Sequence, residues 1–282
     1  MQFCMKKKLL ILISFLNSIF AVAENKVLQL YPEGDANLQK VTIQYFIPQK
    51  SSGSAVIVCP GGGYAGLCDT YEGVDTARYL NQFGITSIVL RYRVGRNLNA
   101  TPLDDVLNAV RYVRENADKY GINPDSIGII GFSAGGHLAS LAATYGQGIS
   151  KVNFQILIYP VISLADEITH KGSQINFLGT LLNEENKQKY SSNLQVTAST
   201  PPAFICHSVT DRIVSVKNSR MYVEALEKFN IPVTYLELPR GAHGFGASRS
   251  PEWKIWQDAC KEWLIANKFG IYLDLRIYDK QR

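Results

Sequence analysis

The chain has 282 residues, of which 46% are hydrophobic and 19% are charged, and its formal net charge is +5 at pH 7. This is the composition of an ordinary globular protein with enough residues for a sizeable core. Three lysines near the N-terminus supply most of the positive charge. The remaining 26 basic and 24 acidic residues form no basic cluster, so neither nucleic acid nor an anionic membrane is expected as a partner.

Residues 1–23 have the pattern of a cleaved export signal. Lysines at positions 6–8 precede an apolar run from Leu9 to Phe20, and Ala21-Val22-Ala23 places small residues where a signal peptidase reads them. A run of about 12 residues is too short to cross a bilayer as a helix, which requires about 20. We therefore expect cleavage after Ala23, a secreted or periplasmic location and no membrane attachment after cleavage. An uncleaved anchor is the alternative.

Residues 24–282 are long enough for one large α/β domain and contain no repeat or linker that would divide them. The four cysteines in this part are Cys59, Cys68, Cys206 and Cys260. An even number permits disulfides in an exported protein, but the spacings match no known framework, so we predict free and largely buried thiols. The sequence has no paired Cys and His spacing of a zinc site, and no metal ligands are predicted.

Strand-like and helix-like segments alternate along this domain. The strand-like runs are almost continuously apolar, which indicates strands that are covered on both faces, as in a parallel sheet. The pattern predicts an α/β fold with a doubly wound, mostly parallel sheet and helices on both faces. The predicted strands are residues 41–47, 55–59, 87–90, 126–130, 154–159, 203–206 and 233–238.

Three segments between or after these strands predict helices. Thr101 is expected to be an N-cap, because a proline and an acid follow it and apolar residues then recur at helical spacing. Ser215 is expected to cap a second helix, and residues 251–267 form a third. Residues 163–199 are polar and irregular, and a connection of this length inside a domain predicts a lid or small cap. The tail, 269–282, has the pattern of an extra strand or a surface strap.

The segment Gly131-Phe132-Ser133-Ala134-Gly135 follows one predicted strand and precedes a helix-like segment. This strand–turn–helix context is that of a nucleophile elbow, in which small residues allow a tight turn that exposes the serine hydroxyl. The position at a helix N-terminus also favours developing negative charge. We predict Ser133 as a nucleophile.

A serine hydroxyl needs a base, and a neutral imidazole usually serves. The chain has four histidines. His137 is expected to be a structural residue inside the fold, His170 to be a solvated residue of the insert, with contact to a substrate as the alternative, and His207 to shape a loop. His243 lies in a glycine-rich loop after the last predicted strand, so it is the predicted base.

An acid must orient the imidazole and stabilise its charged form. In this type of fold the acid lies between the serine and the histidine along the chain. Asp211 follows the predicted strand 203–206, whereas the rival, Asp166, enters the polar insert at once. We therefore predict Asp211 as the acid.

The developing oxyanion needs at least two N–H donors. One is expected from Ala134, the residue after the nucleophile, and another from Pro60-Gly61-Gly62-Gly63-Tyr64, which directly follows the strand 55–59. A phosphate-binding loop is the alternative for these glycines, but the Gly-Lys-Ser/Thr ending is absent.

Together, Cys59–Tyr64, Gly131–His137, Asp211 and Gly241–Phe245 resemble exported acetyl xylan esterases and related carbohydrate esterases of the α/β-hydrolase superfamily, near the hormone-sensitive-lipase-like branch. The resemblance spans roughly residues 40–265. It implies the triad Ser133, Asp211 and His243, and it implies oxyanion donors at Gly62, Gly63 and Ala134. Two departures are Pro60, where the lipase-type loop begins with histidine, and the sequence Ser-Val-Thr before Asp211. Both leave the acyl preference open.

The predicted function is a serine carboxylesterase that removes acetyl or other short acyl groups from plant-type polysaccharide or its oligomers, without a metal or organic cofactor. The partner is therefore an acylated carbohydrate. The alternatives are a peptidase of the prolyl-oligopeptidase type, a non-catalytic hydrolase fold that binds glycans, and a lipase. Four aromatic residues are candidates for stacking on a sugar, with a place in the core as the competing interpretation: Tyr64, Tyr159, Phe177 and Phe245.

Overall fold

The computed structural model describes residues 27–33, 36, 38–165, 167–246 and 250–272. The predicted export signal, Asp166 and residues 273–282 of the tail lie outside these ranges. None of the helices in the described part of the chain has the length and hydropathy that a bilayer crossing requires.

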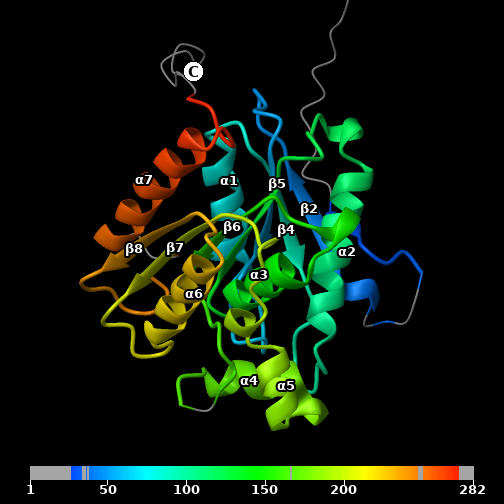
Figure 1. The fold of residues 1–282 in the computed structure, drawn as a ribbon. Helices are drawn as coiled ribbons and strands as arrows, with labels where there is room; N and C mark the ends of the chain where they lie inside the picture. The colour runs from blue at the N-terminus through cyan, green and yellow to red at the C-terminus, as the bar shows by residue number, and fades with distance from the viewer. Residues whose placement is uncertain (1–26, 34–35, 37, 166, 247–249, 273–282) are drawn as a thin grey trace, which may run out of the picture.

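An eight-stranded sheet forms the centre of the molecule, in the order β1-β2-β4-β3-β5-β6-β7-β8 (Figure 1). Strands β3 to β8 run parallel, and β2 pairs antiparallel with both β1 and β4. The predicted doubly wound, mostly parallel sheet is confirmed, although β1 was not predicted. The strands are β1 (Val27–Gln29), β2 (Thr42–Phe46), β3 (Ala55–Cys59), β4 (Thr86–Arg91), β5 (Ile127–Phe132), β6 (Phe154–Ile158), β7 (Ala203–Ser208) and β8 (Val233–Leu238).

Helices cover both faces of this sheet. Helices α2 (Thr101–Glu115), α3 (Ala134–Tyr145) and α6 (Lys217–Lys228) pack on one face. Helices α1 (Thr76–Asn81) and α7 (Pro251–Ala266) pack on the other. Every residue of β3, β5, β6 and β7 is buried between the two layers, which is why these strands are almost continuously apolar.

The helix starts differ from expectation at two positions. Thr101 is the first residue of α2 and not its N-cap; the N-cap is Ala100, which has a φ of 61°. The Thr101 hydroxyl turns back to donate to the carbonyl of Leu98 at 2.7 Å, so it serves the preceding loop. Ser215 is not the N-cap of α6 either; the N-cap is Val216, and the Ser215 hydroxyl accepts the amide of Lys217 at 3.3 Å from the position before it.

The insert 163–199 is not irregular, contrary to expectation. It forms α4 (Lys171–Leu178) and α5 (Glu184–Lys189), which lie together at one end of the molecule (Figure 1), and two short 3₁₀ turns. The side chains of His170 and Asn183 cap the two helices by accepting backbone amides. These caps hold helices whose sequences carry little amphipathic pattern.

The cysteines and the tail behave as predicted where the structure describes them. All four described cysteines are free, and Cys59, Cys206 and Cys260 are buried. Phe269 stacks on Phe154 with ring centroids 3.9 Å apart, and its carbonyl accepts the Ser52 hydroxyl. The described start of the tail therefore forms a strap along the sheet.

Candidate active site

The carboxyl ends of five parallel strands bring the predicted site residues to one edge of the sheet. The loop Pro60–Tyr64, called the glycine-rich loop below, follows β3. Ser133 follows β5, Tyr159 follows β6, and the loops after β7 and β8 supply Asp211 and His243. Open α/β sheets bind ligands at this edge. Residues that lie far apart along the chain therefore meet here.

Ser133 lies in a strained turn between β5 and α3. Its φ of 53° is in the left-handed region, which a non-glycine residue adopts only when the surroundings impose it. A Cβ atom at Gly131 would lie 2.1 Å from the carbonyl oxygen of Gly135, and one at Gly135 would lie 2.1 Å from that of Cys59. Both glycines are therefore required, as the elbow pattern predicts.

Three side chains form a continuous hydrogen-bond chain. His243 Nε2 lies 2.9 Å from Ser133 Oγ, and His243 Nδ1 lies 2.6 Å from Asp211 Oδ2. The side chain of Asp211 is fully buried and that of His243 is 18% exposed. This geometry lets the imidazole take a proton from the hydroxyl while the carboxylate holds its tautomer.

Asp211 is surrounded by donors. Its Oδ1 accepts the amides of Ile213 and Val214 at 2.9 and 3.0 Å, and its Oδ2 also lies 3.4 Å from His207 Nε2. Burial alone acts to raise the pKa of this carboxyl, but the hydrogen bonds from His207 and His243 outweigh it and hold the pKa well below its ordinary value. Asp211 is therefore anionic at neutral pH.

The glycine-rich loop offers unpaired amides next to Ser133. Gly62 and Gly63 have φ values of 133° and 63°, and a Cβ at Gly62 would lie 2.2 Å from the carbonyl oxygen of Gly66. Within the described part of the chain, no acceptor receives the N–H of Gly62, Gly63 or Ala134. A Cβ at Gly61 would lie 3.1 Å from the Cβ of Ser133, which places the loop directly against the serine.

Glu72 is part of this site, and sequence reasoning missed it. It lies on the π-helix η2 (Asp69–Asp75), is 5% exposed, and accepts the Gly61 amide and the Tyr159 hydroxyl at 2.7 Å each. Burial raises its pKa, opposed by these two hydrogen bonds and by the nearby His243. An acid within an irregular helix has no sequence pattern that separates it from a surface acid.

The other three histidines have distinct positions. His137 is fully buried between the Tyr64 hydroxyl and the Tyr190 carbonyl, and burial lowers its pKa to about 4, so it is the expected structural residue. His207, on β7, forms a hydrogen bond with Ser219 Oγ of α6. His170 is half-buried rather than solvated: its Cε1 would lie 3.5 Å from a Cβ at Gly63.

The four aromatic candidates for sugar stacking do not present a ring to solvent. Tyr64, Tyr159 and Phe177 are 0% exposed and Phe245 is 2% exposed. Their rings pack on one another and on the histidines of the site. The structure contradicts the stacking expectation and favours the core interpretation, because the insert and the loop after β8 cover these rings.

Comparison with known proteins identifies relatives by sequence. The BD-FAE family model matches residues 43–226, which is more than half of the chain. An acetylxylan esterase of Xylanibacter ruminicola is 39% identical over 211 residues, 73% of this chain and 44% of that protein. The endo-1,4-beta-xylanase B of Butyrivibrio fibrisolvens is 33% identical over 216 residues, 71% of this chain and 34% of that protein. The chain thus spans less than half the length of these two curated relatives.

Comparison with solved structures agrees with the sequence comparison. An acetyl ester-xyloside bifunctional hydrolase from Caldicellulosiruptor lactoaceticus superposes with a TM-score of 0.80 and 32% identity, over 87% of this chain and 97% of that one. An α/β hydrolase from a Medee basin deep-sea metagenome gives a TM-score of 0.70 and 27% identity, over 86% and 97% of the two chains. The chain therefore belongs to the BD-FAE family and has the α/β-hydrolase fold.

Proposed function

We propose that this protein is a serine carboxylesterase that removes acetyl or other short acyl groups from a plant-type polysaccharide or its oligomers. The observation that carries the proposal is the hydrogen-bond chain from Asp211 through His243 to Ser133, beside the unpaired amides of the glycine-rich loop. The names of two relatives, an acetylxylan esterase and an acetyl ester-xyloside hydrolase, support the acyl group and the sugar.

The mechanism is a two-step acyl transfer. His243 takes the proton of Ser133 as the hydroxyl oxygen attacks the ester carbonyl, and the tetrahedral oxyanion accepts N–H bonds from Gly62, Gly63 and Ala134. Each such donor typically lowers the barrier by about 3 kcal/mol. His243 then gives the proton to the leaving sugar oxygen, which departs as an alcohol. Water, deprotonated by His243, attacks the acyl-enzyme and releases the carboxylic acid.

The proposal extends to the location of the protein. A polysaccharide does not cross a cell membrane unaided, so an enzyme that deacylates one acts outside the cytoplasm. The pattern of residues 1–23, a basic start followed by a short apolar run and small residues, supports export with cleavage after Ala23. N-terminal sequencing of the protein recovered from its native host would test it, and a chain beginning at Met1 would contradict it.

The decisive experiment measures acid release from three substrate classes: acetylated xylan, feruloylated xylan and dipeptide anilides. We expect acetate from the first, no cleavage of the anilides, and no release by Ser133→Ala, whose thermal unfolding should match the wild type. Cleavage of the anilides in preference to the esters would favour a peptidase. A wild-type protein that binds xylan but releases no acid would favour a glycan-binding role.

A further inference from the structure

A second concave site lies beside the glycine-rich loop. It has a volume of about 640 Å³ and is formed mainly by residues 91–99, the segment that follows β4, together with Lys40, Leu67 and Thr101. The backbone amide of Gly95 donates to the carbonyl of Tyr64 at 2.7 Å, which ties this segment to the glycine-rich loop. We call it the β4 groove.

The lining of the β4 groove is rich in donors and poor in acceptors. Four cationic side chains line it, Lys40, Arg91, Arg93 and Arg96, and no Asp or Glu does. Asn99 also lines it; its Oδ1 is engaged by the backbone amide and hydroxyl of Thr180, which leaves its NH₂ group as the remaining donor. A neutral sugar hydroxyl both donates and accepts, whereas a carboxylate only accepts. The lining therefore matches a carboxylate.

The positive charge of this lining is only partly neutralised. Asp105 offsets Arg93 through contacts of 2.7 to 3.0 Å. Arg91 Nη2 bonds to Asp69 at 2.8 Å, while its Nη1 is buried and has no acceptor among the described residues. Arg96 is exposed and forms no ion pair with any residue that the structure describes. The charge of Arg96 suits one monovalent anion.

The groove is held in a strained conformation by its neighbours. Asn97, Asn99 and Ala100 all have φ values between 51° and 61°, which is unusual for three non-glycine residues in one loop. The insert braces them, because the amides of Leu98 and Ala100 donate to the carbonyls of Asn176 and Phe177. Backbone strain of this kind persists where a surrounding structure imposes it, typically at ligand-binding segments.

The contacts that hold this loop also reach the edge of the sheet at which Ser133 lies. The side-chain amide of Asn176 donates to the carbonyl of Gly63 at 2.9 Å, so one residue of α4 contacts both the β4 groove segment and the glycine-rich loop. A ligand group in the groove is therefore positioned relative to Ser133. This points to a second part of the same substrate molecule.

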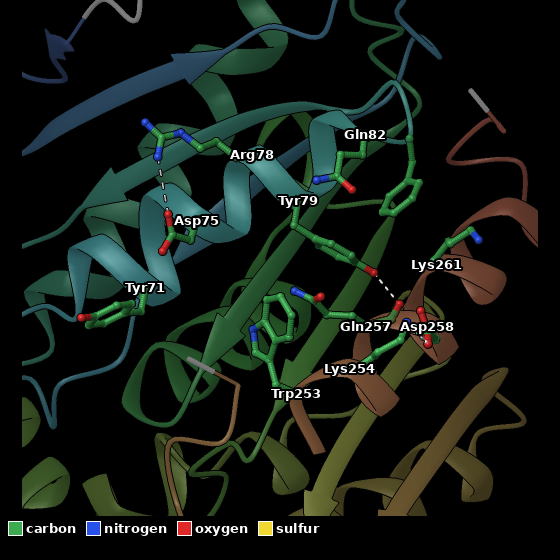
Figure 2. A pocket seen from close by; sticks show the side chains of 11 residues that line it. Tyr71, Asp75, Arg78, Tyr79, Gln82, Trp253, Lys254, Gln257, Asp258 and Lys261 are labelled. Carbon is green, nitrogen blue, oxygen red and sulfur yellow. Dashed lines mark hydrogen bonds and ion pairs between the residues drawn. The ribbon is translucent and has the colours of Figure 1, made fainter. Parts of the chain in front are cut away.

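A groove elsewhere in the described part of the molecule differs in charge. It lies between α1 and α7 and has a volume of about 510 Å³ (Figure 2). Two of its three cations are paired within the groove, Arg78 with Asp75 at 3.6 Å and Lys254 with Asp258 at 2.8 Å, and the third, Lys261, contacts Glu262 at 3.5 Å. Every cation that lines the groove between α1 and α7 thus contacts an acid, whereas Arg96 in the β4 groove has no such contact among the described residues.

We propose that the β4 groove binds the carboxylate of a uronic acid substituent on the acylated glycan while the ester lies at Ser133. This rests on the proposed function, since it assigns a charged branch to the same substrate. Arg96 supplies the main contact, and Asn99 donates a neutral hydrogen bond.

The test compares two acetylated xylo-oligosaccharides of equal length, one with a glucuronic acid branch and one without. We expect the wild type to favour the branched substrate by about 5-fold in kcat/KM, through KM, because a partly exposed charge pair contributes about that much. Arg96→Gln should abolish this preference and leave kcat/KM for the unbranched substrate unchanged. Lys254→Gln, in the groove between α1 and α7, is the matched control and should keep the preference. Raising NaCl to about 0.5 M should weaken the preference.

Calorimetric titration with the same glucuronic acid-branched oligosaccharide, without its acetyl groups, tests the groove independently of hydrolysis. We expect binding by the wild type that is weakened about 5-fold in Arg96→Gln. Equal kcat/KM for both substrates, or titration curves that Arg96→Gln does not change, would overturn the proposal. Absence of acetate release with binding intact would instead contradict the proposed function and leave the groove assignment supported.

Discussion

The two sides of the catalytic edge each bury a carboxyl group, and the two groups differ in how many donors surround them. On the side of β7 and β8, Asp211 receives two backbone amides and lies against two imidazoles. On the side of β3, Glu72 receives one backbone amide and one tyrosine hydroxyl. The pKa of Asp211 is accordingly lowered and that of Glu72 is raised.

For Glu72 the effect of burial on the pKa exceeds that of the hydrogen bonds, whereas for Asp211 the hydrogen bonds exceed the effect of burial. Asp211 keeps its negative charge and can stabilise a charged His243 directly. Glu72 does not contact Ser133 or His243 by hydrogen bond; it joins the glycine-rich loop to Tyr159, whose φ of 38° is itself strained. In the proposed mechanism Asp211 therefore serves the proton transfer, whereas Glu72 is expected to position the oxyanion donors.

The largest expected effect on this comparison is that of Asp211→Asn. The asparagine amide would favour the wrong tautomer of His243, so we expect kcat for p-nitrophenyl acetate to fall by about 10³- to 10⁴-fold with little change in KM. Steady-state kinetics and a thermal unfolding curve would check this. Retention of more than about a tenth of wild-type kcat would show that another group orients the imidazole.

A smaller effect is expected on the other side of the edge. Glu72→Ala frees the Gly61 amide and should misplace the donors of Gly62 and Gly63, which predicts a fall in kcat of about 10- to 100-fold, below the full loss of an oxyanion donor. Glu72→Gln keeps one acceptor for Gly61 and a donor for the Tyr159 oxygen, so its loss should stay under about 5-fold.

A merely structural Glu72 would give a different pattern. Because the residue is expected to act through the transition state, kcat should fall and KM should stay near its wild-type value in Glu72→Ala. The matched variant Tyr64→Phe removes a buried hydrogen bond to His137 and should lower the unfolding temperature without this kinetic change. Equal kinetic losses in both variants would mean that Glu72 only stabilises the fold.

The smallest expected effect concerns pH and stability. A carboxyl group with a raised pKa in the folded state binds its proton more tightly there, so Glu72 contributes stability below its ordinary pKa of about 4.3 and loses that contribution as the pH rises through the raised value. Glu72→Gln should therefore gain stability relative to the wild type as the pH rises from 4 to 8, by about 1.4 kcal/mol per pKa unit. Urea unfolding at both pH values measures it. A difference that stays constant would contradict the raised pKa.

The sequence predicted the residues that local pattern specifies. Glycines on both sides of Ser133 and the order of the acid and the histidine along the chain placed three side chains that the structure brings within hydrogen-bond distance. Continuous apolar runs predicted the parallel strands, because each face of the sheet carries a helical layer.

What the sequence could not supply depends on tertiary packing. Phe177 and Tyr159 are buried by contacts from segments far away in the sequence. The sequence pattern around an aromatic residue does not distinguish a ring that faces a ligand from one that faces the core. Glu72 lies on a π-helix, whose period no simple pattern predicts. The helices of the insert depend on side-chain caps in a polar stretch, so composition alone suggested irregular chain.

Labelling with a fluorophosphonate probe tests whether His243 activates Ser133. Mass spectrometry of the digested protein should find the adduct on Ser133 in the wild type, with labelling slowed by at least about 10³-fold in His243→Ala. An unlabelled wild-type protein, an adduct on a different serine, or labelling of His243→Ala at the wild-type rate would contradict the account.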